Sequence, residues 1–83
     1  MRAVAAALLM SACGGIPQPE ACEKYLACSE AVQPMSTRDT KATYGPGGTC
    51  WMNASDAESC REVCELATRA LKMGAGRSTP ECQ

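Results

Sequence analysis

The chain has 83 residues, a formal net charge of −1 and no histidine. This length allows one small domain, and the near-neutral charge excludes the strongly basic surface typical of nucleic-acid-binding proteins. Hydrophobic residues make up 46% of the chain, but there is no Phe and a single Trp. So few large apolar side chains cannot by themselves offset the ordering entropy of the chain, and the composition therefore predicts covalent cross-links.

Seven cysteines stand out in so short a sequence. This density is typical of a disulfide scaffold, and such a scaffold forms in an oxidising compartment. Because seven is odd, one cysteine must have a different role.

The first twelve residues are predicted to be a signal peptide that is removed. Arg2 is followed by an apolar stretch over 3–10 and then by Ser11 and Ala12, the order of an export signal and far too short to span a bilayer. The tetrapeptide MSAC at 10–13 resembles a bacterial lipobox, which implies that Cys13 is lipidated, with acyl chains such as palmitate, and becomes the first residue. An alternative is an alanine-rich helix of a cytosolic domain with Cys13 as a buried thiol, but the segment is apolar on every side.

The remaining chain is predicted to form a short tether and one domain. Residues 13–19 carry two glycines and two prolines and are expected to be a lipidated tether, followed by a disulfide-stapled helical domain over 20–83. A first helix is predicted over 19–33, between Pro19 and Pro34. The segment 34–49 is rich in Thr, Gly and Pro and is predicted to be a long loop with a turn over 44–48. An alternative is that part of it lengthens the first helix or forms a short helix near 39–44. Trp51 is expected to cap the core.

A second helix is predicted from Ser55 to Met73. Ser55 and Glu58 form a capping-box pattern, and Gly74 stops the helix. Asn53 begins an N-glycosylation sequon, but we interpret this triplet as part of the helix start. One apolar stripe recurs at helical spacing, at Cys60, Val63, Cys64, Ala67 and Leu71.

These elements predict a small all-α, disulfide-rich fold, an antiparallel helical hairpin with a long Gly/Pro-containing loop. Antiparallel order places the later cysteine of the first helix beside the earlier cysteine of the second helix, and the reverse. The two remaining cysteines then join the loop to the tail. Among the fifteen pairings that six cysteines allow, this order favours Cys28–Cys60, Cys22–Cys64 and Cys50–Cys82.

Candidate chemistry is sparse. The lack of histidine removes the commonest general base, and the carboxylates lie on predicted solvent faces, so we expect neither an enzyme nor a bound cofactor or metal. The alternative is a zinc or copper site formed by Cys22, Cys28, Cys60 and Cys64, which is less favoured because an exported chain meets oxidant first. The predicted loop offers a candidate binding surface on Arg38, Asp39, Lys41 and Tyr44.

Three patterns together, C-x2-Y-x2-C at 22–28, YGPGGTCW at 44–51 and C-x3-C at 60–64, resemble small cysteine-rich lipoproteins of Gram-negative bacteria. The resemblance implies export and lipidation, and it supplies no activity. We therefore expect a lipid-anchored structural or binding module of the bacterial envelope, with the membrane and an unidentified envelope component as partners and no nucleic acid. Because Gly14 stands where an aspartate would favour retention at the inner membrane, the outer membrane is favoured. A secreted soluble effector or inhibitor is a further alternative.

Overall fold

The computed structural model describes residues 15–83, which form helices joined by short connections and contain no strand. The three α-helices are α2 (Glu20–Val32), α3 (Thr37–Tyr44) and α4 (Ala54–Met73). Three short 3₁₀ turns accompany them, η1 (Pro34–Ser36), η2 (Thr49–Met52) and η3 (Pro80–Cys82). The fold is small, helical and disulfide-bonded, as the composition predicts.

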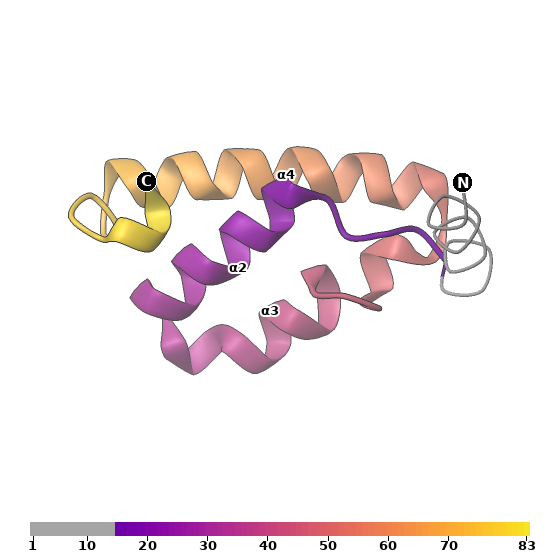
Figure 1. The fold of residues 1–83 in the computed structure, drawn as a ribbon, viewed down its shortest axis with the longest axis horizontal. Helices are drawn as coiled ribbons and strands as arrows, with labels where there is room; N and C mark the ends of the chain where they lie inside the picture. Colours follow the sequence, from indigo (N-terminus) through magenta and orange to yellow (C-terminus); the bar gives the residue numbers. More distant parts are fainter. Residues whose placement is uncertain (1–14) are drawn as a thin grey trace, which may run out of the picture.

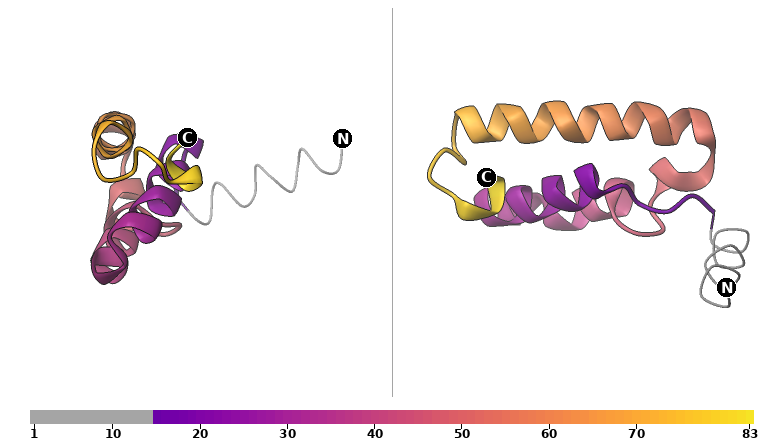
Figure 2. Two further views of the ribbon diagram at one scale, coloured as in Figure 1. Left: turned by 90° about the vertical axis from the view of Figure 1, so that its left-hand side faces the viewer. Right: turned by 45° about the horizontal axis from the view of Figure 1, so that its top comes forward.

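The arrangement of the helices differs from the predicted hairpin. Figure 1 shows α2 and α4 running in the same direction, while α3 runs back between the end of α2 and the start of η2. The second view in Figure 2 agrees, with α4 along one side of the layer formed by α2 and α3. The antiparallel pairing of the first and last helices is therefore wrong, because the connection between them contains a helix that returns the chain to its starting end.

The segment predicted to be a long loop is mostly helical, and the alternative of a short helix near 39–44 is confirmed by α3. Pro34 ends α2 and opens η1, and α3 then follows through Tyr44. Thr, which has low helix propensity, occupies three of the eight positions of α3. The Thr40 hydroxyl donates to the Ser36 carbonyl at 2.8 Å, and the helix packs along α2 and η2. Tertiary packing thus outweighs weak local propensity here.

A tight turn after α3 follows from its glycines and proline. The Gly48 amide donates to the Gly45 carbonyl at 2.9 Å, and Gly47 has a φ of 75°. Pro46 and Gly47 therefore take the two central positions of a type II turn, which requires a positive φ at the second of them. The turn predicted over 44–48 is present.

We expect Gly48→Ala to destabilise the fold by about 1–3 kcal/mol, the usual cost of overpacking. A Cβ at Gly48 would lie 2.5 Å from the Thr43 carbonyl oxygen, which belongs to the backbone of α3 and cannot move aside. Gly47→Asn is the matched control, because a Cβ there meets nothing within 4 Å and Asn tolerates positive φ. Chemical denaturation of both oxidised variants checks this, and equal losses would contradict the steric argument.

Helix α4 begins two residues earlier than the capping pattern predicts. Asn53, rather than Ser55, is the N-cap, and its Oδ1 accepts from the Asp56 amide at 2.8 Å. Its Nδ2 donates to the Asp56 carboxylate at 2.9 Å, so Asn53 and Asp56 bond to each other twice. The sequon residue is part of the helix start, as interpreted, and the helix ends at the predicted Met73.

The core consists mainly of sulfur and one indole. Among the described residues, the buried apolar side chains are those of Cys22, Cys28, Cys50, Trp51, Cys64 and Cys82. Half-buried side chains from the N-terminal segment, α2, α3 and α4 pack around four of them, Cys22, Cys50, Trp51 and Cys64. The predicted role of Trp51 is confirmed, since its side chain is 3% exposed.

Candidate functional site

Three disulfides connect the elements, and only one has the predicted partners. The bond between Cys22 and Cys64, with Cα atoms 5.0 Å apart, joins α2 to α4 as expected. The predictions of Cys28–Cys60 and Cys50–Cys82 are wrong. Cys28 bonds Cys82 and Cys50 bonds Cys60, with Cα separations of 4.5 and 5.9 Å.

The direction of the helices explains this pairing. Cys28 lies six residues beyond Cys22 on α2, about 9 Å further along the helix axis. Because α2 and α4 run the same way, this displacement carries Cys28 toward the tail and away from Cys60, which precedes Cys64. Cys60 instead faces η2, the segment leading directly into α4, where Cys50 lies.

The alternative metal site is wrong because its four cysteines are already bonded in disulfides. Cys22, Cys28, Cys60 and Cys64 belong to three different disulfides, and disulfide sulfurs are not the thiolates that bind zinc or copper(I). Within residues 15–83, no group of three or more Cys, Asp or Glu side chains is placed to hold a metal ion.

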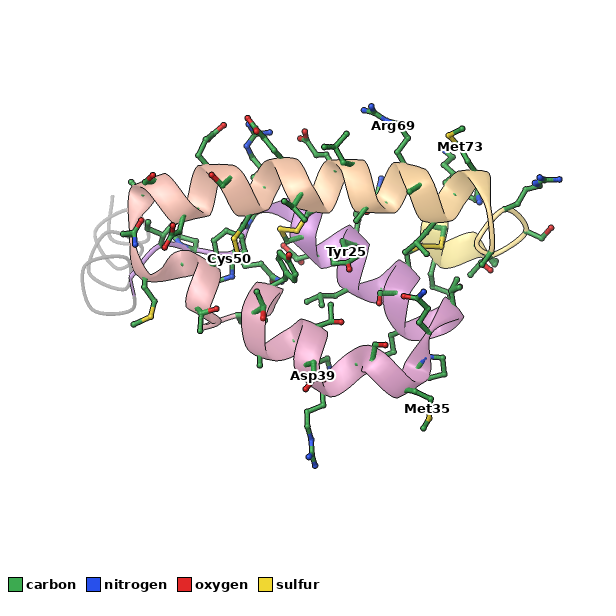
Figure 3. All side chains as sticks on the ribbon, turned by 180° about the vertical axis from the view of Figure 1, so that it is seen from behind. Tyr25, Met35, Asp39, Cys50, Arg69 and Met73 are labelled. Carbon is green, nitrogen blue, oxygen red and sulfur yellow. A yellow bond between two sulfur atoms is a disulfide. The ribbon has the colours of Figure 1, made fainter. Side chains whose placement is uncertain are left out.

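The candidate binding loop is the helix α3. Arg38 and Asp39 are exposed on it, and Figure 3 shows Asp39 on the side of α3 away from α4. The Lys41 ammonium lies 3.9 Å from the Glu30 carboxylate of α2. Tyr44 does not extend into solvent but is half-buried against the core. The four residues therefore form no mobile recognition loop, because helix formation separates the charged side chains from the ring.

Tyr44 belongs instead to an aromatic cluster. Its ring meets that of Tyr25 edge to face, with centroids 5.4 Å apart. Burial, together with the neighbouring Tyr44, raises the pKa of Tyr25 above its usual value. The Trp51 Nε1 donates to the Gly45 carbonyl at 2.8 Å and lies 3.3 Å from the Tyr44 carbonyl. The indole thus holds the end of α3 against η2.

The segment 15–19 is bound to this cluster along its length. The Ile16 amide donates to the Trp51 carbonyl at 3.2 Å, and the Gln18 side-chain amide donates to the Tyr44 carbonyl at 2.8 Å. Ile16 also packs on the buried core. The segment is extended, as its prolines predict, but residues 16–19 belong to the domain rather than to a separate tether (Figure 1). Cys13 and the predicted signal peptide lie outside the described residues.

An open groove of about 350 Å³ runs between this segment and the first turns of α4. Its lining residues are mainly apolar, namely Ile16, Pro17, Pro19, Ala54 and Ala57, with Glu58 and Arg61 at one side. The Arg61 guanidinium binds the carboxylates of Glu58 and Glu65. The hydrogen bond that Arg61 donates to Glu58, and secondly the positive charge of Arg61, lower the pKa of Glu58.

The outer face of α4 was not identified from the sequence. Val63, which belongs to the predicted apolar stripe, is 43% exposed, and Leu66 and Met73 are 60% and 71% exposed. Figure 3 shows Met73 and Arg69 projecting from α4 on the side opposite α2 and α3. A second stripe, at 59, 63, 66, 70 and 73, alternates spacings of four and three residues. This spacing is the sequence pattern that could have identified the outer face.

No family model, no curated protein and no solved structure matches the chain. No helix in the described part of the chain is long and apolar enough to cross a membrane.

Proposed function

We propose that the protein is an exported lipoprotein, whose small disulfide-stabilised domain is anchored at a bacterial envelope membrane by an acylated Cys13 and acts there as a binding or structural module. Gly14 after the acylated cysteine favours the outer membrane. The metal alternative is not retained, and the secreted effector or inhibitor remains as an outcome of the test below.

The observation that carries the proposal is the distribution of cysteines. Six of the seven pair with one another in residues 15–83. The seventh, Cys13, directly follows the apolar stretch and the small residues Ser11 and Ala12, the context of a lipobox. Three disulfides in so small a domain also support an oxidising compartment, which is where an export signal would send the chain.

The bound N-terminal segment limits how far the domain could lie from a membrane to which Cys13 is anchored. Cys13 precedes Ile16 by three residues, which span at most about 11 Å. Because Ile16 is hydrogen-bonded to Trp51 and packed on the core, little free chain would separate the domain from the lipid headgroups. The proposed module therefore works at the membrane surface, with contacts limited to partners that reach that surface.

Mass spectrometry of the protein expressed in a Gram-negative host tests the proposal. We expect a mature chain that begins at Cys13 and carries acyl chains, found in the membrane fraction. We also expect alkylation under non-reducing denaturation to label none of the other six cysteines.

Cys13→Ser is the matched control, because it removes the acceptor sulfur and leaves the apolar stretch intact. Its product should be neither acylated nor cleaved before residue 13. An unmodified, soluble wild-type chain cut at another small residue would overturn the lipid anchor and support the secreted alternative.

A further inference from the structure

The outer face of α4 carries the heptad spacing of a helix-pairing seam. Val63, Leu66, Ala70 and Met73 follow one another at intervals of three, four and three residues, and all are exposed. This is the spacing of the a and d positions through which two α-helices pack. Seen along α4 in the left view of Figure 2, the other helices lie on one side only, so this face is open to a partner.

Two opposite charges flank the seam at equivalent positions. Glu62 and Arg69 each directly precede an a position, Val63 and Ala70, and they are seven residues apart. Both are exposed, and neither has an ion-pair partner within residues 15–83. The side chains at the other edge of the seam, such as Ala67, are small and uncharged.

We propose that this face binds a second copy of the chain, with the two α4 helices antiparallel. In that orientation Val63 of each copy packs on Leu66 of the other, and Glu62 of each copy meets Arg69 of the other, so one contact repeats twice about a two-fold axis. In a parallel pair the charged edge would face the uncharged edge, and neither charge would find a partner. The charge pattern thus selects a second copy, and it selects the antiparallel orientation.

The size of the seam sets the expected affinity. The seam is short, and small interfaces are typical of weak, transient complexes, so we expect a dissociation constant on the order of 0.1 mM. The inference does not depend on the proposed lipid anchor, but it is compatible with it. With the two-fold axis along the bilayer normal, residue 15 of both copies lies at the same height above one membrane.

Sedimentation equilibrium of the full-length oxidised protein, in density-matched detergent between about 0.01 and 0.5 mM, tests the proposal. We expect reversible dimerisation in the wild type. Glu62→Arg alone places like charges at both contacts and should weaken the dimer at least about tenfold, as should Arg69→Glu alone. The double variant Glu62→Arg/Arg69→Glu restores both pairs in the swapped sense, and its affinity should return to within about threefold of the wild type.

Two further variants separate the seam from general surface effects. Leu66→Ala should weaken the dimer by more than about tenfold because its side chain is lost from both copies. Met35→Ala removes a side chain that is 96% exposed at the far corner between α2 and α3, and it should leave association unchanged. Circular dichroism and disulfide mapping verify that each variant is folded. A wild type that stays monomeric over the whole concentration range, or a double variant that dimerises no more tightly than the single variants, overturns the proposal. Two chains that merely share a micelle would not respond to these substitutions.

Discussion

Reduction of the three disulfides is expected to unfold the protein. The loops they close have sequence separations of 42, 54 and 10 residues. Chain-entropy arguments assign about 4 kcal/mol to each of the two longer loops and about 3 kcal/mol to the shortest. The total stability of a small domain is only about 5–15 kcal/mol. Because the same sulfurs form most of the buried core, reduction removes cross-links and leaves too little apolar packing to hold the helices together.

The measurement is circular dichroism of protein reduced in denaturant and returned to buffer containing excess reductant. Loss of helical signal and of a cooperative thermal transition is expected. Replacing one pair at a time grades the effect. Cys28→Ala/Cys82→Ala opens the longest loop and releases the tail from α2, and it should cost more stability than Cys50→Ala/Cys60→Ala. A reduced protein that melts at the temperature of the oxidised one would contradict this view of the core.

Local sequence signals were sufficient for the two longer helices. Pro19 and Pro34 bracket α2 within one residue, because proline is favoured at a helix start and cannot continue one. The end of α4 was fixed by Gly74. Its start was displaced because Asn53 and Ser55 can both cap a helix, and the choice between them depends on the partner, Asp56 or Glu58.

The direction of the chain could not be predicted from such signals. Helix α3 has weak intrinsic propensity and is held by contacts with α2 and η2, so its existence depends on the fold it helps to form. Without α3 the natural expectation is two helices joined by a loop, which run antiparallel. The predicted disulfide pairing is wrong as a consequence. The six residues from Cys22 to Cys28 lead toward the start of α4 if the helices are antiparallel, and toward its end if they are parallel.

The attachment of the N-terminal segment was missed for a related reason. Its hydrogen bonds go to the backbone carbonyls of Tyr44 and Trp51, and carbonyls are present at every residue. Glycine and proline content therefore predicted an extended segment correctly but said nothing about what that segment lies against. The packing of the candidate binding residue Tyr44 could not be predicted either, because only the folded chain brings its ring to Tyr25.

Trp51→Ala is expected to destabilise the oxidised protein by about 3–5 kcal/mol, the range for removing a buried large aromatic side chain. Trp51 is the largest buried side chain, and it contacts the region where the N-terminal segment, α3 and η2 converge. Its loss opens a cavity beside Cys22–Cys64 and removes one of the two donors to the Gly45 carbonyl, which keeps its bond from the Gly48 amide. Urea denaturation followed by circular dichroism measures the effect, since the variant lacks the only tryptophan of the chain.

Trp51→Phe separates the two contributions, because it keeps an aromatic ring in the core but removes the Nε1 donor. We expect an intermediate loss, of which about 0.5–1.5 kcal/mol reflects the lost Nε1 hydrogen bond. Hydrogen exchange at the Ile16 amide gives a local readout, since that amide donates to the Trp51 backbone carbonyl, which every variant retains. Faster exchange in Trp51→Ala would show that the indole's packing, rather than the backbone bond alone, holds the N-terminal segment on the domain. Unchanged exchange together with a loss below about 1 kcal/mol would contradict the central role of the indole.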